Sequence, residues 1–235
     1  KDSTSIIDGA VVFAGGVGIG RTLSASGISC SGIGIDTQQF GPGSTTDFAV
    51  GSVAVGVRAA AFSDSSVALG VDCSTNDIEG IAIGNAASVV ANGGVAIGTR
   101  ATAQGQGGIT IGRDAITIDI ADIAIGENAF SQGGFGVSSI SIGFGASCAT
   151  GASVALGASA ICSATNAFAL GASPSAAQNS VALGTSSQAN FNGSIALAGT
   201  TTAVGQFVAG NQSTSLTSLI VGKGDRNSSP NTTLT

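Results

Sequence analysis

Residues 81–98 read IAIGNAASVVANGGVAIG, and this stretch contains one tetrapeptide twice, fourteen residues apart. The tetrapeptide consists of an apolar residue, a small residue, a second apolar residue and glycine. Its eleven copies begin at residues 53, 67, 81, 95, 109, 123, 140, 154, 168, 181 and 195, and the last ends in alanine, Ala198. One step is seventeen residues and one is thirteen, whereas the others are fourteen. A fixed short period of this kind is typical of solenoids, in which each repeat forms one coil.

Each copy predicts a short β-strand. Two apolar residues separated by one residue lie on the same face of a strand, which we expect to be the interior. The glycine permits a turn or a close backbone approach. Small residues follow it by three and five positions, as at Ala59 and Ala61, and predict a second strand across a narrow interior. The expected fold is therefore all-β, a parallel β-roll of about eleven 14-residue coils stacked about 4.8 Å apart.

The residue between the two apolar residues forms a column of its own. By the same alternation we expect it to point away from the roll interior, where alanine would form a flat apolar stripe. Such stripes usually mark an interface, so the sequence predicts a homo-oligomer of side-by-side rolls, most simply a homotrimer. The predicted oligomer interface consists of Ala54, Ala68, Ala82, Ala96, Ala124, Ala155, Ala169, Ala182 and Ala196. The alternative interpretation is an exposed surface with no partner.

Composition excludes several functions. Only 9% of the 235 residues are charged, and histidine is absent, which removes the commonest general base and metal ligand. We therefore predict no enzyme activity, no cofactor and no metal. Seven Lys and Arg against a net charge of −6 argue against nucleic-acid binding. No apolar run reaches about 18 residues, so we expect no membrane insertion.

Charged residues recur in one column two positions after the glycine. Stacked coils would place Arg58 over Asp72 and Arg100 over Asp114, about 5 Å apart. The sequence thus predicts a salt ladder that sets the register of the coils.

Two of the four cysteines share a column. Cys148 and Cys162 lie in consecutive repeats, so their Cα atoms would lie within disulfide range. Two interpretations stay open, a disulfide or two small buried thiols. Cys30 and Cys73 have no obvious partner.

Acidic residues gather in two short runs whose spacing fits neither an EF-hand loop nor the G-G-x-G-x-D repeat of calcium-binding rolls. We interpret them as solvated loop edges. They are Asp114, Asp119, Asp122 and Glu127 in one run, and Asp72, Asp77 and Glu79 in the other.

The repeat resembles the head of YadA-like trimeric autotransporter adhesins. Residues 179–187, NSVALGTSS, carry the resemblance, together with SVALG at 66–70 and 153–157. The resemblance covers residues 48–200. It implies a left-handed parallel β-roll, three chains side by side, and binding to host matrix or cell surfaces. The family's stalk heptads, neck motif and membrane barrel have no counterpart in these residues.

The flanking regions depart from the regular repeat. Residues 8–20, DGAVVFAGGVGIG, and 23–27 resemble a glycine-rich module of viral tail and virion-surface fibres. We expect a glycine-rich module over 1–47 with a loop at 36–47, regular coils over 48–200, and a polar tail over 201–235. That tail contains degenerate coils at 207–210 and 219–222. Because Gly20 and Gly34 are fourteen residues apart, the alternative that the glycine-rich module consists of imperfect first coils stays open.

These observations predict an adhesive or structural fibre segment on the exterior of a virion or a cell. Its partners would be other copies of the chain and a host cell-surface or matrix molecule. The alternative is an extracellular filament subunit that assembles end to end without binding a receptor. Ice binding and polysaccharide cleavage are disfavoured, because the ranks of threonine or the charged clusters that they require are missing.

Overall fold

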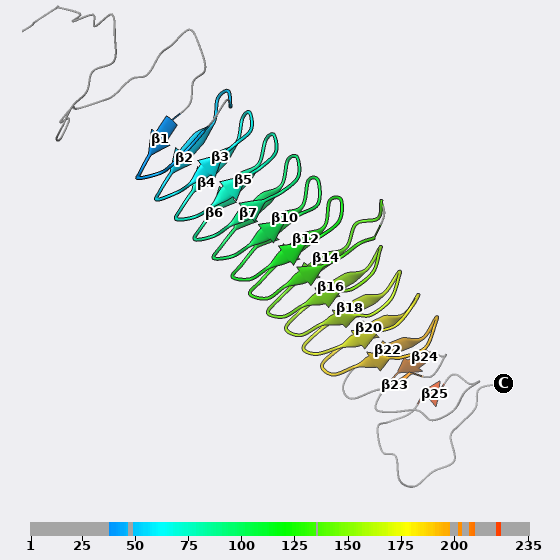
Figure 1. Ribbon diagram of the computed structural model, residues 1–235. Helices are drawn as coiled ribbons and strands as arrows, with labels where there is room; N and C mark the ends of the chain where they lie inside the picture. Colours follow the sequence, from blue (N-terminus) through cyan, green and yellow to red (C-terminus); the bar gives the residue numbers. More distant parts are fainter. Residues whose placement is uncertain are drawn as a thin grey trace, which may run out of the picture. The chain divides into compact units, whose positions relative to one another are not determined.

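The computed structural model describes residues 38–46, 49–134, 136–197, 202–203, 207–209 and 220–221. Its strands form two parallel sheets that face each other along a stack of coils (Figure 1). The longer sheet, sheet A, contains β1 Gln38–Phe40, β2 Val53–Val55, β4 Val67–Leu69, β6 Ile81–Ile83, β8 Val95–Ile97, β10 Ile109–Ile111, β12 Ile123–Ile125, β14 Ile140–Ile142, β16 Val154–Leu156, β18 Phe168–Leu170, β20 Val181–Leu183, β22 Ile195–Leu197, β24 Phe207–Ala209 and β25 Ile220–Val221. Sheet B contains β3 Ala60–Ala61, β5 Ser74–Thr75, β7 Ser88–Val89, β9 Thr102–Ala103, β11 Ile116–Thr117, β13 Phe130–Ser131, β15 Ser147–Cys148, β17 Ile161–Cys162, β19 Ser175–Ala176, β21 Gln188–Ala189 and β23 Thr202–Ala203.

Each coil consists of one strand of sheet A, a turn, one strand of sheet B and a second turn. The chain then returns to sheet A one strand further along, so the pairing is parallel and in register. Val95 pairs with Ile109, for example, and Ile109 pairs with Ile123. The strands β2 to β22 of sheet A coincide with the eleven copies of the tetrapeptide. The predicted all-β parallel solenoid is therefore confirmed.

The glycine of the tetrapeptide is required by the close stacking of coils. Gly98 has a φ of +132°, and a Cβ built on it would lie 2.5 Å from the carbonyl oxygen of Gly112 in the next coil. No side chain can occupy that space. Two residues later the chain turns through the left-handed region, as at Arg100 with a φ of 57°. These two positions together form the corner between sheet A and sheet B.

The interior of the roll is packed with small side chains. The residues three and five positions after the glycine are wholly buried, as predicted, including Ala59, Ala61, Val89 and Ala101. Larger side chains here are accommodated by glycine opposite them. A Cβ on Gly94 would lie 2.8 Å from Val89.

The orientation predicted for the tetrapeptide strands is wrong. Its middle residues point into the roll and are wholly buried: Ala54, Ala68, Ala82, Ala96, Ala124, Ala155, Ala169, Ala182 and Ala196. The apolar residues on either side of them point outward and are at least partly exposed. The physical reason is width, because two sheets joined by coils of about fourteen residues leave room between them for small side chains, and a larger one such as Val89 fits where glycine lies opposite it.

The N-terminal end of the described stack corrects a second expectation. Residues 36–47 were expected to form a loop, but Gln38–Phe40 forms β1 and pairs in register with β2. Gly41 is equivalent to the tetrapeptide glycine of the later coils. A Cβ built on it would lie 2.5 Å from the carbonyl oxygen of Gly56 in the next coil. The polar residues Gln38 and Gln39 concealed this repeat.

At the other end, strands lie where the degenerate coils are predicted, at β24 and β25. The viral-fibre resemblance at 8–27 and most of the polar tail lie outside the described residues. None of the described segments is a helix that is long and apolar enough to cross a membrane.

Candidate interaction surface

The outward side chains of sheet A form a continuous apolar surface, which we call the outer strand face. It consists of the first and third residues of β2 to β22. The first residues are Val53, Val67, Ile81, Val95, Ile109, Ile123, Ile140, Val154, Phe168, Val181 and Ile195, and the third residues are Val55, Leu69, Ile83, Ile97, Ile111, Ile125, Ile142, Leu156, Leu170, Leu183 and Leu197. Every member is apolar.

The side chains of this face are partly exposed. The most exposed are Ile109 at 36%, Ile142 at 38% and Leu170 at 43%, and the others are half-buried. Since the strands pair in register, each column stacks equivalent side chains at the strand spacing of about 4.8 Å, and eleven strands extend over roughly 50 Å. A soluble chain rarely leaves an apolar surface of this extent in contact with water, and large exposed patches usually mark an interaction site.

Sheet B presents a different outward face. Its outward residues include Ser74, Ser88, Thr102 and Ser175, which are all half-buried. Apolar side chains interrupt this column at Ile116, Phe130 and Ile161. The two faces of the roll therefore differ, and only the outer strand face is apolar along its whole described length.

The predicted salt ladder is present. Arg58 Nε donates to Asp72 Oδ1 at 2.5 Å, and Arg100 Nε donates to Asp114 Oδ1 at 2.6 Å. Both contacts are bidentate, because Nη2 of each arginine donates to Oδ2 of the same aspartate. The hydrogen bond from the guanidinium lowers the pKa of Asp72 and of Asp114 below the ordinary value. These pairs are solvent-exposed and join consecutive coils.

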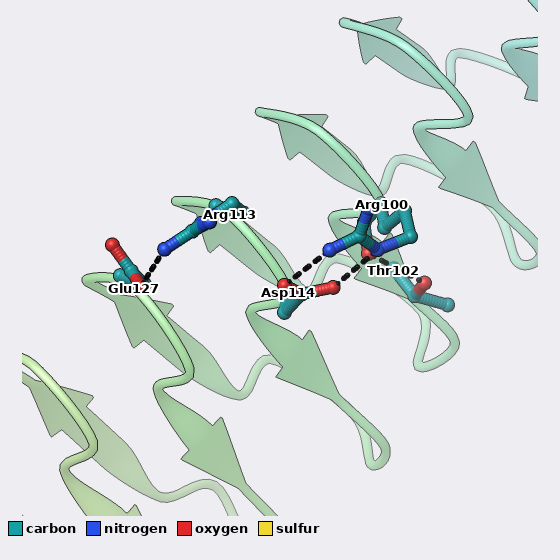
Figure 2. Close-up of polar contacts among 5 residues, drawn as sticks. All are labelled: Arg100, Thr102, Arg113, Asp114 and Glu127. Atoms are coloured by element: carbon teal, nitrogen blue, oxygen red, sulfur yellow. Dashed lines mark hydrogen bonds and ion pairs between the residues drawn. The ribbon is translucent and has the colours of Figure 1, made fainter.

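A third ion pair was missed. Arg113 pairs with Glu127 in the next coil, beside the Arg100–Asp114 pair (Figure 2). The signal was in the sequence, since these residues are also fourteen apart and lie one position after the glycine. Each of the three pairs is satisfied within the chain, so they support the stacking of the coils.

Asp122 corrects the interpretation of the acidic runs. This residue was expected at a solvated loop edge, but it is wholly buried. Its carboxylate accepts backbone N–H bonds from Asp119 at 3.0 Å, Gly133 at 3.0 Å and Ser139 at 2.8 Å. Gly133 and Ser139 bracket the segment that lengthens the coil between Gly126 and Gly143. Asp122 therefore holds both ends of the longer loop.

The remaining acidic residues lie nearer the surface. Asp72 and Glu79 are exposed, whereas Asp77, Asp114, Asp119 and Glu127 are half-buried. Asp119 accepts an N–H bond from Gly134 at 2.8 Å. Within the described ranges, no three Cys, Asp or Glu side chains are grouped so that they could hold a metal ion.

The cysteines of the shared column lie side by side. Cys148 of β15 and Cys162 of β17 are partners in the parallel pairing, and both are wholly buried free thiols. Cys73 is also buried and free. Cys30 lies outside the described residues.

Comparison with known proteins supports the resemblance. A family model described as the YadA head domain repeat matches residues 49–72, 78–101, 90–115 and 175–197. A solved structure, the collagen-binding domain of the Yersinia adhesin YadA, matches with 20% sequence identity and a TM-score of 0.43. That match covers 71% of this chain and 82% of the other chain. No curated protein sequence matches. These four segments match the YadA head repeat, the family that the tetrapeptide resembles.

Proposed function

We propose that this chain, several of whose coils match the YadA head repeat, is a segment of an adhesive fibre exposed on a cell surface, in which three rolls lie side by side. The outer strand face is the observation that carries the proposal. It is apolar at every position and continuous over eleven strands.

Association through the outer strand face is favourable because of its area. Each coil supplies two partly exposed apolar residues, and removing their remaining exposed apolar surface from water contributes about 25 cal/mol per Å². Three rolls arranged around one axis would bury one such face each, and closed symmetry leaves no equivalent face free for further growth. The polar residues of sheet B would then face outward.

The buried alanines of the tetrapeptide support this arrangement indirectly. They allow the two sheets of one roll to approach closely, so that the larger side chains are directed outward. The interface that we propose is therefore displaced by one residue from the alanine column that the sequence predicted.

The proposed adhesive role rests on the repeat family, and it requires no catalytic site. We propose that the fibre binds a matrix or cell-surface molecule through its outward surface, which includes sheet B. Binding of the purified protein to immobilised collagen and to other immobilised matrix proteins tests this role. Saturable binding to at least one of them is expected, and binding to none would contradict it.

The oligomeric state is tested by light scattering on the purified chain and on two variants. Ile97→Asp places a charge on the outer strand face, and Thr102→Asp places the same charge on sheet B as the matched control. We expect a trimeric mass for the wild type and for Thr102→Asp, and a smaller folded species for Ile97→Asp. A monomeric wild type, or open-ended filaments in electron micrographs, would contradict the closed trimer.

A further inference from the structure

Two cysteines face each other inside the roll in the first coils after the lengthened loop. Cys148 and Cys162 are in-register partners of adjacent parallel strands. Neighbouring strands lie about 4.8 Å apart, within the Cα separation of about 4.4–6.8 Å that disulfides span. Both side chains belong to the same interior column and have no exposed surface. Their sulfur atoms are therefore held close together by the backbone pairing on either side.

The present hydrogen bonds of these thiols are weak. Cys148 Sγ donates to the carbonyl oxygen of Ile140 at 3.2 Å, and Cys162 Sγ donates to that of Val154 at 3.2 Å. A thiol is a poor donor, so little is lost when the two S–H groups are removed. The thiolate is the nucleophile in disulfide exchange, and either cysteine can attack first.

We propose that Cys148 and Cys162 are a disulfide-forming pair that joins two adjacent coils covalently. The oxidant is a disulfide, either a small-molecule disulfide or the disulfide of an oxidoreductase. The thiolate of one cysteine attacks one sulfur of this oxidant and displaces the other as a thiolate. The second cysteine then loses its proton and attacks the sulfur of the first, which releases the second thiol. The two cysteines lose two electrons and two protons, and the oxidant is reduced to two thiols.

The buried position determines when the bond forms. The oxidant cannot reach the pair in the closed coil, so the exchange takes place while these coils are still folding. The bond would then clamp the coils that follow the loop lengthened by three residues between Gly126 and Gly143. This inference does not depend on the proposed adhesive function.

Cys73 provides a control within the same roll. It is equally buried, but the equivalent positions in the adjacent coils are Ala59 and Ala87. Its Sγ donates to the carbonyl oxygen of Gly70 at 3.5 Å. Cys73 therefore has no thiol beside it and is expected to stay reduced under the same conditions.

The test uses a Cys30→Ser/Cys73→Ser chain, in which only the pair remains. The chain is refolded with oxidised and reduced glutathione, unfolded in denaturant with N-ethylmaleimide and weighed by mass spectrometry. Neither cysteine should be alkylated unless a reductant is added first, and non-reducing electrophoresis should show a single chain. Alkylation of both cysteines without reductant, or a disulfide between chains, would overturn the proposal.

Two further variants complete the test. Cys148→Ser should fold, because Ser131 occupies the equivalent position in the preceding coil. Its midpoint of thermal unfolding should no longer change with reductant, whereas that of the pair-only chain should fall. A chain that keeps Cys73 alone should be alkylated without reductant. If the pair-only chain showed no such fall, the bond would not clamp the coils and that part of the proposal would be wrong.

Discussion

Gly98 lies so close to Gly112 of the next coil that a methyl group on Gly98 would lie 2.5 Å from the Gly112 carbonyl oxygen. The same contact recurs at each tetrapeptide glycine from Gly56 to Gly171, with distances of 1.9 to 2.7 Å. The coils are therefore stacked backbone against backbone at this corner, and the stacking distance leaves no room for a side chain.

We expect Gly98→Ala to destabilise the roll by about 3 kcal/mol, because steric overlap adds to the strain of a positive φ. The matched control is Gly93→Ala. Gly93 also has a positive φ, of +65°, but a Cβ there would meet nothing within 4 Å, and Ala121 adopts a similar φ of 56°. Urea unfolding should show a cost of about 1 kcal/mol for the control. Equal costs would show that the close approach is not what requires glycine.

The inward direction of the alanine column can be tested at Ala96. Ala96→Leu inserts a larger side chain into a filled interior, and overpacking of this kind costs about 1–3 kcal/mol. The neighbouring substitution Ile97→Leu keeps an apolar residue on the outer strand face and should change stability little. The free energy of unfolding from urea titration measures both. A neutral Ala96→Leu would contradict the interior position of this residue.

Removal of the Asp122 carboxylate should release the lengthened loop. Asp122→Asn replaces one acceptor oxygen with a donor, so at least one buried N–H loses its partner, at a cost of about 1–3 kcal/mol. Hydrogen exchange should accelerate at the amides of Gly133 and Ser139. Glu79→Gln, which removes an exposed carboxylate, is the control and should leave both amides protected. Unchanged protection in Asp122→Asn would contradict this role.

The same residue affects the pH dependence of stability. Burial raises the pKa of Asp122, and the three N–H donors oppose that shift only in part. The folded state thus holds the proton more tightly than the unfolded state. The stabilisation that follows from this shift is present at pH values below the pKa of Asp122 in the unfolded chain. It is lost as the pH rises through the higher pKa of Asp122 in the folded chain. Unfolding at a series of pH values should show that Asp122→Asn lacks this component.

The ion pairs should have the opposite pH dependence. The pKa of Asp72 and of Asp114 is lowered by the hydrogen bond from its arginine. The resulting stability is present above the ordinary aspartate pKa and is lost as the pH falls through the lower, folded value. The advantage of the wild type over Arg58→Ala/Arg100→Ala should therefore shrink in acid and also in high salt. A difference that is independent of both would contradict the pairing.

The sequence by itself determined the period, the positions of the strands and two of the ion pairs. In a stacked solenoid, residues one period apart become neighbours, so Arg58 and Asp72 are brought together by their spacing alone. The pairing of Cys148 with Cys162 follows from the same rule. The strand at Gln38–Phe40 was not predicted, because its residues lack the apolar pattern. Its pairing with β2 and the close backbone approach of Gly41 to Gly56 identify it as part of a coil.

The tertiary structure decided which side of each strand is the interior. An alternating pattern such as Val95-Ala96-Ile97 assigns the apolar and the small residues to opposite faces of the strand. It does not determine which of these two faces lies inside the roll. The width of the coil settles the choice, since the space between the sheets accepts small residues such as Ala96 and holds a larger one, Val89, where glycine lies opposite it. Asp122 shows the same limit, because its burial depends on N–H groups that the lengthened loop brings to it from eleven and seventeen residues away.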